Sequence, residues 1–256
     1  SGVIRCGTDN SLMEKVQSIN QAIGNISRKI ITKLESGIPQ SDPAIVKDLE
    51  CVNDASVQIE KFVYDRCLYW LEEGKQVIVA GGEHSVPLGF IRALSEYNTD
   101  FGILQIDAHA DLRFAYEGFN QSHASIMHNV LQIDQATKIV QVGIRDVSPA
   151  EMELALKDPR IHPVSGFEIK TGLFAGRSWF EKCRDIVSLL PQKVYVSFDI
   201  DGLEPQYCPN TGTPVAGGLT PDEALYLIRV IAESGRSIIG ADLCEVAPGN
   251  DEWDAN

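Results

Sequence analysis

Short apolar runs alternate with amphipathic segments over the last two thirds of the chain. The runs are rich in Val and Ile, and they lie at 76–80, 102–106, 138–144, 193–200 and 237–243. Apolar residues recur at helical spacing in the segments between them, at 85–97, 122–132, 149–157, 177–190 and 221–234. Apolar strands joined by helices predict an α/β fold with three layers, α-β-α, in which helices cover both faces of a mainly parallel sheet.

The first part of the chain has a different pattern. Residues 11–73 repeat apolar side chains at helical spacing, and Gly37, Pro39 and Pro43 interrupt the repeat. We therefore expect two helices before the sheet begins. The chain has 256 residues, of which 44% are hydrophobic, and no linker composition divides it. This favours one domain, 1–256, with a sizeable core.

Polar residues gather where the predicted strands end. They form four groups: Gly81-Gly-Glu-His84, Asp107–Asp111, Asp199–Asp201 and Glu245. In a parallel sheet the carboxyl ends of the strands meet at one edge, and ligands bind there. The four groups therefore predict a single functional site at that edge.

The segment Asp107-Ala-His-Ala-Asp111 has metal-ligand side chains at every second residue. In an extended chain, residues two apart point to the same side, so Asp107, His109 and Asp111 converge. Asp199 and Asp201 repeat the spacing. Gathering these groups at strand ends is unfavourable unless a cation neutralises them.

His84 follows a glycine pair that permits a sharp turn, and we assign it as a further ligand. Two imidazoles and four carboxylates without a thiolate suit Mn²⁺ better than structural zinc. Six ligands are too many for one catalytic ion with an open position. Two Mn²⁺ ions about 3.5 Å apart fit better, and such a pair lowers the pKa of a shared water towards about 7.

The formal net charge of −14 argues against a nucleic-acid partner and favours a cationic substrate, although it also serves solubility. The six cysteines form no C-x-x-C pair, and we find no secretory signal and no apolar run of membrane-spanning length. We expect a cytoplasmic protein with reduced thiols and no membrane contact.

Beyond these patterns, the chain resembles the ureohydrolase superfamily of arginases, agmatinases and formimidoylglutamases. The matching motifs occur in the family order over about two thirds of the sequence. They are Gly81-Gly-Glu-His-Ser85, Asp107–Asp111, Ser122-His123-Ala124, Ser197–Pro205, Thr211–Pro214, Gly217–Thr220 and Glu245-Val-Ala-Pro248. Glu83 departs from the pattern, since relatives usually carry Asp there.

The resemblance implies an arginase/deacetylase-like fold and a role for each site residue. His84, Asp107, Asp111 and Asp199 match the ligands of one Mn²⁺, and His109, Asp107, Asp199 and Asp201 match those of the other. Asp111 also accepts a hydrogen bond from the attacking water. His123 matches a proton shuttle to the leaving amine, and Glu245 matches the carboxylate that binds the guanidinium. The implied reaction releases urea and an amine.

The metal ligands are shared by the whole superfamily, so the substrate must be read from the loops. Residues 112–123 resemble the agmatinase-like branch, and Ser148 stands where arginases have an Asp. Val215 is closer to arginase, since agmatinases usually have Glu there. Agmatine is therefore the favoured substrate, and arginine, formimidoylglutamate and other guanidino acids remain alternatives.

Two further expectations follow from the resemblance. The family's opening strand and closing helix have no counterpart at either end of this sequence, and relatives commonly form homotrimers or homohexamers. A zinc deacetylase of related fold would need a tandem His pair, which the five histidines do not contain. A catalytically silent regulatory homologue is a remote alternative, because every functional position is filled.

Overall fold

The computed structural model describes residues 10–247 and residue 249. The expectations about the family's opening strand and closing helix concern the two ends of the sequence, and residues 1–9 and 250–256 lie outside the described residues. The described part contains a fully parallel sheet whose strands follow the order β1-β6-β5-β2-β3-β4. The strands are β1 (Ile78–Ala80), β2 (Phe101–Ile106), β3 (Ala136–Ile144), β4 (Ile161–Ser165), β5 (Lys193–Asp199) and β6 (Ser237–Cys244).

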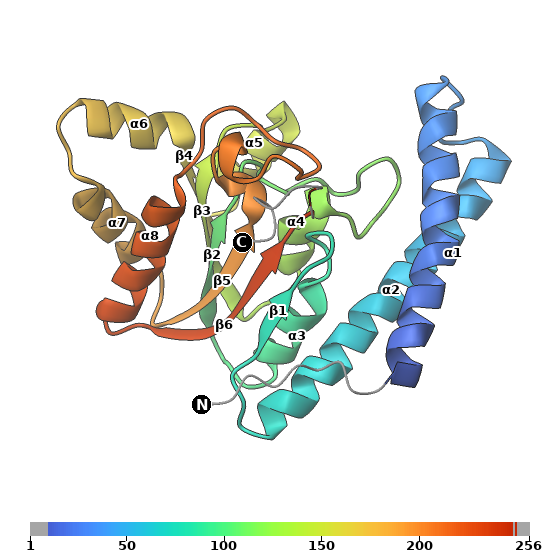
Figure 1. The fold of residues 1–256 in the computed structure, drawn as a ribbon, viewed down its shortest axis with the longest axis horizontal. Coiled ribbons are helices and arrows are strands. Elements are labelled where there is room, and N and C mark those ends of the chain that lie inside the picture. The colour runs from blue at the N-terminus through green and yellow to red at the C-terminus, as the bar shows by residue number, and fades with distance from the viewer. Residues whose placement is uncertain (1–9, 248, 250–256) are drawn as a thin grey trace.

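Helices cover both faces of the sheet, as Figure 1 shows. One face packs against α2 (Pro43–Glu72), α3 (Leu88–Ser95), α4 (Ile126–Val130) and α5 (Pro149–Lys157). The other packs against α6 (Gly166–Phe174), α7 (Trp179–Ser188) and α8 (Pro221–Glu233). Strand β2 is buried along its whole length, as a central parallel strand requires. The predicted three-layer α/β fold is confirmed.

Two long helices precede the sheet, as predicted. Helix α1 (Asn10–Glu35) packs on α2, and the small core between them contains Ile30, Ile45 and Leu49. The Asp42 side chain accepts a hydrogen bond from the backbone N of Ala44, and Pro43 occupies the first turn of α2. These two features explain where the second helix begins.

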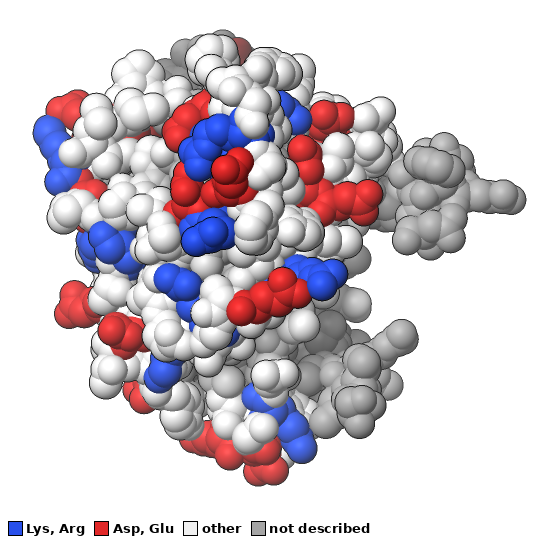
Figure 2. Space-filling model, turned by 90° about the vertical axis from the view of Figure 1, so that its left-hand side faces the viewer, with Lys and Arg blue, Asp and Glu red and all other residues white. Residues whose placement is uncertain are grey.

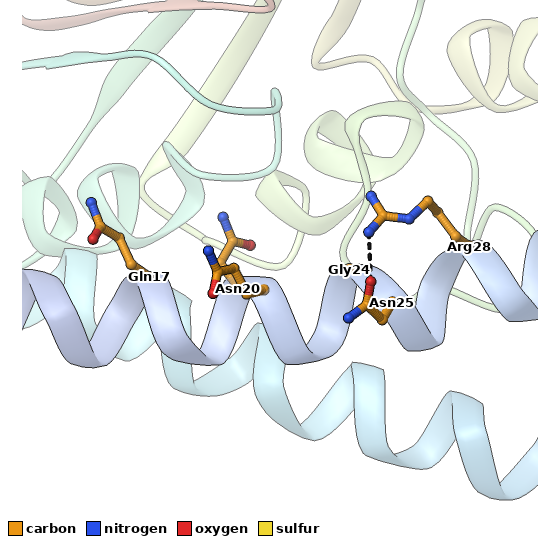
Figure 3. Close-up of a pocket in the computed structure, with 6 residues that line it drawn as sticks. Gln17, Asn20, Gly24, Asn25 and Arg28 are labelled. Carbon is orange, nitrogen blue, oxygen red and sulfur yellow. Dashed lines mark hydrogen bonds between the residues drawn. The ribbon is translucent and has the colours of Figure 1, made fainter.

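A polar hollow runs along α1, lined by Gln17, Asn20, Gln21, Gly24, Asn25 and Arg28 (Figure 3). Its lining contains no carboxylate, imidazole or thiol, and Arg28 donates to Asn25 Oδ1 at 2.7 Å. The hollow therefore lacks the residue types that the sequence predicts as ligands of the metal site.

The sequence patterns did not predict strand β4 and helix α6. Strand β4 lies at the sheet edge, where burial is incomplete, so it lacks the apolar run of a central strand. It also contains Pro163, which has no backbone N–H to donate and is tolerated in an edge strand. Helix α6 follows it directly. The predicted helix 122–132 is instead a 3₁₀ turn, His123–Ser125, followed by the short α4. The edge strand β1 is shorter than predicted.

Acidic and basic side chains are interspersed over α6, α7 and α8 on the face drawn in Figure 2. Several of them pair, including Arg177 with Asp185 and Arg229 with Glu233. The described part of this face therefore has no basic stripe of the kind that follows a phosphate backbone. Among the described helices, none combines the length and the apolar character needed to cross a membrane.

Candidate metal centre

The strand order explains why the predicted site residues meet. Strands β1, β6, β5 and β2 are consecutive neighbours in the sheet, and each is followed at its carboxyl end by one of the four polar groups. A Cβ on Gly202 would lie 2.8 Å from the backbone N of Asp107, so glycine allows the β5 end to approach the β2 end closely.

His84 lies at the centre of the first cluster and is fully buried. Its Nδ1 is 3.2 Å from Asp107 Oδ2, 3.0 Å from Asp111 Oδ2 and 3.3 Å from Asp199 Oδ2. Gly81 and Gly82, with φ of 92° and 80°, form the turn that brings the imidazole to this position. The structure therefore groups all four residues predicted for one ion.

His109 lies at the centre of the second cluster. Its Nδ1 is 3.1 Å from Asp201 Oδ2 and 3.6 Å from Asp107 Oδ1. Asp107 thus directs one carboxylate oxygen toward each histidine, and it belongs to both of the groups of described residues that could hold a metal ion. The two clusters are joined through this one side chain.

The site concentrates buried negative charge. Burial and the neighbouring charge of Asp107 raise the pKa of Asp111 to about 7 and that of Asp199 to about 10. Burial opposes the charging of His109, yet Asp107 and Asp201 raise its pKa to about 11. Such shifts mean that, without a cation, protons must neutralise part of this cluster.

The donor set fits a divalent cation. His84 Nε2 contacts Ser197 Oγ at 2.8 Å, whereas its buried Nδ1 has no hydrogen-bond partner and faces carboxylate oxygens. In metal-binding histidines one ring nitrogen usually forms a hydrogen bond with the protein, and this bond orients the other nitrogen toward the metal. Imidazole nitrogen with carboxylate oxygen is a ligand set that suits Mn²⁺.

Glu245 lies beside the first cluster, just after β6. Its Oε1 accepts a hydrogen bond from the backbone N of His84 at 2.9 Å, and its own N–H donates to Gly82 O at 3.0 Å. Glu245 and Asp111 are two of the three described non-glycine residues with positive φ, at 60° and 54°. Such backbone strain costs about 1–3 kcal/mol and is common at functional sites.

His123 begins the 3₁₀ turn, and its neighbours come from a distant loop. Glu83 Oε1 accepts a hydrogen bond from the backbone N of His123 at 2.6 Å and lies 3.2 Å from its Nδ1. Tyr116 packs edge-on against the imidazole, with ring centroids 5.5 Å apart. The hydrogen bond with Glu83 raises the pKa of His123, which is a property that suits a proton donor at neutral pH.

Several residues that orient the ligands were not identified from the sequence. Gln105 Nε2 donates to Asp107 Oδ2 at 2.8 Å, and Gln141 Nε2 donates to Gln105 Oε1 at 2.6 Å. Tyr195 donates to the buried Asp242 at 2.7 Å, whose other oxygen lies 3.9 Å from His84 Nε2. Their signal is a polar residue inside an otherwise apolar strand.

Arg145 ties another loop to the site. Its Nη2 donates to the backbone O of Asp201 at 2.6 Å and to that of Val215 at 3.0 Å. Ser148 caps α5, because its Oγ accepts a hydrogen bond from the backbone N of Glu151. The same Oγ donates to Glu151 Oε2 at 2.6 Å. The position that arginases fill with Asp is thus occupied here by a helix cap.

Comparison with known proteins identifies the family of the chain. The chain matches the Arginase family over residues 16–255. It is 33% identical over 187 residues to an N(1)-aminopropylagmatine ureohydrolase of Synechocystis sp., covering 73% of this chain and 58% of that protein. It is 37% identical over 179 residues to an agmatinase of Bacillus subtilis, covering 70% and 58%.

The fold has known counterparts as well. An agmatine ureohydrolase of Thermoplasma volcanium superposes with a TM-score of 0.64 at 27% identity, covering 78% of this chain and 64% of that one. The chain spans less than three fifths of the length of each of the two curated relatives, at 58%. The family match, the relatives and the geometry of the site agree, and the chain belongs to the Arginase family.

Proposed function

We propose that this ureohydrolase uses two Mn²⁺ ions to cleave the guanidino C–N bond of a small cationic substrate, with agmatine as the first candidate. The observation that supports this most directly is the pair of histidine–carboxylate clusters that share Asp107. One ion would be held by His84, Asp107, Asp111 and Asp199, and the other by His109, Asp107, Asp199 and Asp201. When bound, the ions supply charge stabilisation and an activated water at neutral pH.

Glu245 provides the recognition of the guanidinium. Its carboxylate is fixed by the backbone N of His84, so the group that meets the cation is oriented before the substrate arrives. A carboxylate matches the planar donor fork of a guanidinium. Asp111 accepts a hydrogen bond from the attacking water, and His123 delivers a proton from its ring nitrogen to the departing amine.

The loops favour agmatine, or its aminopropyl derivative, over arginine. Ser148 caps α5 and, as a serine, has no carboxylate that could bind an α-ammonium group. The names of the two curated relatives, an aminopropylagmatine ureohydrolase and an agmatinase, support the same choice. The acidic chain, with a net charge of −14, favours the approach of a substrate with two positive charges.

Urea release from a panel of guanidines tests the proposal. Agmatine, aminopropylagmatine, arginine, guanidinobutyrate and guanidinopropionate are each incubated with and without Mn²⁺, and formimidoylglutamate is followed through formamide. We expect Mn²⁺-dependent urea release that is fastest with agmatine or its aminopropyl derivative. Faster release from arginine would overturn the substrate assignment, and silence across the panel with Mn²⁺ bound would overturn the activity.

We also propose that the enzyme acts in the cytoplasm as a homotrimer or homohexamer. Several thiols, including those of Cys183, Cys208 and Cys244, are buried, and burial raises the pKa of each. Their scattered spacing suits a reducing compartment. Sedimentation of the protein with bound Mn²⁺ tests the assembly, and a monomer would refute it.

A further inference from the structure

Glu83 and His84 are consecutive residues, yet their side chains serve different parts of the site. His84 points into the metal cluster, whereas the Glu83 carboxylate reaches His123 on the loop that precedes α4. The turn that contains Glu83 is also tied to Glu245, whose N–H donates to Gly82 O at 3.0 Å. The segment 82–84 therefore contains the proposed metal ligand His84 and contacts both Glu245 and His123.

Glu83 contacts His123 at two atoms. Its Oε1 accepts from the backbone N at 2.6 Å and faces ring Nδ1 at 3.2 Å. The other oxygen, Oε2, accepts a hydrogen bond from Ser85 Oγ, which fixes the carboxylate itself. A residue that is anchored at both its backbone and its ring loses most of its freedom about χ1 and χ2.

The contact between Glu83 and the His123 ring determines which ring nitrogen carries the hydrogen. A carboxylate is an acceptor, so the neutral ring must carry its hydrogen on Nδ1 where the two groups face each other. The remaining nitrogen, Nε2, is then the one that exchanges protons with the substrate. The Glu83 side chain is 43% exposed, and its carboxylate is held by Ser85 Oγ and by the backbone N of His123. A carboxylate that fixes the tautomer and orientation of a catalytic imidazole is a known arrangement in hydrolases.

We infer that Glu83 is a positioning residue that holds the His123 imidazole with Nε2 free for proton transfer to the leaving amine. The inference rests on the proposed function, because it concerns the proton shuttle of that reaction. The side-chain contacts of Glu83 are to Ser85 and His123, so its effect on the reaction would pass through His123. The edge-on contact of Tyr116 with the imidazole also restricts the ring.

Glu83→Gln is the informative variant, because the amide oxygen can still accept from the backbone N of His123. We expect kcat to fall about 10- to 100-fold, because the neutral amide keeps the hydrogen bond but no longer stabilises the protonated ring from which His123 delivers its proton. KM and the bound Mn²⁺ should change little. Glu83→Asp keeps the charge on a side chain one methylene shorter, and it should recover part of the lost kcat.

Glu60→Gln is the matched control. Glu60 holds the same loop through the side chain of Gln121, two residues before His123, but it does not contact the imidazole. We expect its kcat to stay near that of the wild type. An equal fall in kcat for Glu60→Gln and Glu83→Gln would mean that general loosening of the loop, and not ring positioning, causes the effect.

A double-mutant cycle with His123→Ala separates positioning from a structural role. Once the imidazole is absent, Glu83→Gln should cause no further loss of kcat, because its effect passes through the ring. A loss as large as in the wild-type background would overturn the inference.

Nitrogen NMR of the histidine rings gives a readout that does not depend on turnover. At a pH where the ring is neutral, His123 should show the tautomer protonated at Nδ1, and Glu83→Ala, which removes the acceptor oxygen, should lose this preference. The His123→Ala spectrum identifies the signal among the five histidines. An unchanged tautomer in Glu83→Ala would contradict the inference even if the enzyme cleaved no guanidine. A changed tautomer in an inactive protein would leave Glu83 assigned and refute only the proposed activity.

Discussion

The imidazole of His84 is held from behind by Ser197, whose Oγ lies 2.8 Å from Nε2, so that Nδ1 faces the carboxylates of the metal centre. Replacing Ser197 with Ala removes this partner, and we expect the affinity for Mn²⁺ to fall about 10- to 100-fold. Titration calorimetry of Mn²⁺ binding measures the change. Ser188→Ala removes an exposed hydroxyl that donates to a backbone oxygen, and it should leave the affinity unchanged. Equal affinities for the two variants would contradict the role of Ser197.

Asp111→Asn should abolish turnover with little effect on the fold. The amide is a poorer metal ligand and cannot serve as the charged acceptor for the attacking water. Burial and the charge of Asp107 raise the pKa of Asp111 to about 7, so removing this carboxylate also relieves repulsion in the metal-free protein above that pH. Urea release and thermal unfolding measure the two effects. Undiminished turnover would refute the assignment of Asp111.

Glu245→Gln should weaken substrate binding above all. The amide can keep the hydrogen bond from the backbone N of His84 but cannot offer a charged partner to a guanidinium. Hydrogen bonds to charged groups contribute about 1.5–3 kcal/mol, so we expect KM to rise about tenfold or more. Steady-state kinetics with agmatine measure this change. A fall in kcat at constant KM would point to a different role for Glu245.

Stabilisation by Mn²⁺ should increase with pH. The folded pKa values of Asp111 and Asp199, about 7 and about 10, exceed the usual 3.8, so the metal-free folded state binds more protons than the unfolded state between these values. The folded pKa of His109, about 11, exceeds 6.5 and acts in the same direction. Stability of the metal-free protein therefore falls as pH rises through this window.

Mn²⁺ takes the place of those protons, so its stabilising effect should be larger where fewer protons compete. Thermal unfolding with and without Mn²⁺ at about pH 6 and about pH 8 tests this expectation. The rise in Tm caused by Mn²⁺ should be greater at the higher pH. A smaller rise at the higher pH would mean that protons do not compete for this site.

The repeating patterns of the sequence predicted the layers, and they predicted that acidic and imidazole side chains would meet at the carboxyl edge of the sheet. Alternating apolar runs indicate strands wherever burial is complete, and the two-residue spacing of Asp107, His109 and Asp111 indicates which side chains converge. The sequence patterns did not predict strand β4, because an edge strand is only partly buried and needs no apolar run. Its identity depends on pairing with β3, which is a contact between distant parts of the chain.

The supporting contacts of the site were harder to predict for a related reason. Gln141, Gln105 and Asp107 form a chain of hydrogen bonds across two strands, and only the register of β2 with β3 brings them together. The contact between Glu83 and His123 joins residues 40 positions apart. Local spacing contains no information about such pairs, whereas a buried polar residue inside an apolar strand does mark where one is needed.

The number of Mn²⁺ ions held by each chain tests the central claim most directly. Equilibrium dialysis against Mn²⁺, followed by elemental analysis, is carried out on the wild type and on Asp107→Asn. Because Asp107 faces both His84 and His109, we predict two ions per chain in the wild type and a loss at both sites in the variant. A single ion in the wild type, or two ions retained by Asp107→Asn, would contradict the shared two-metal centre.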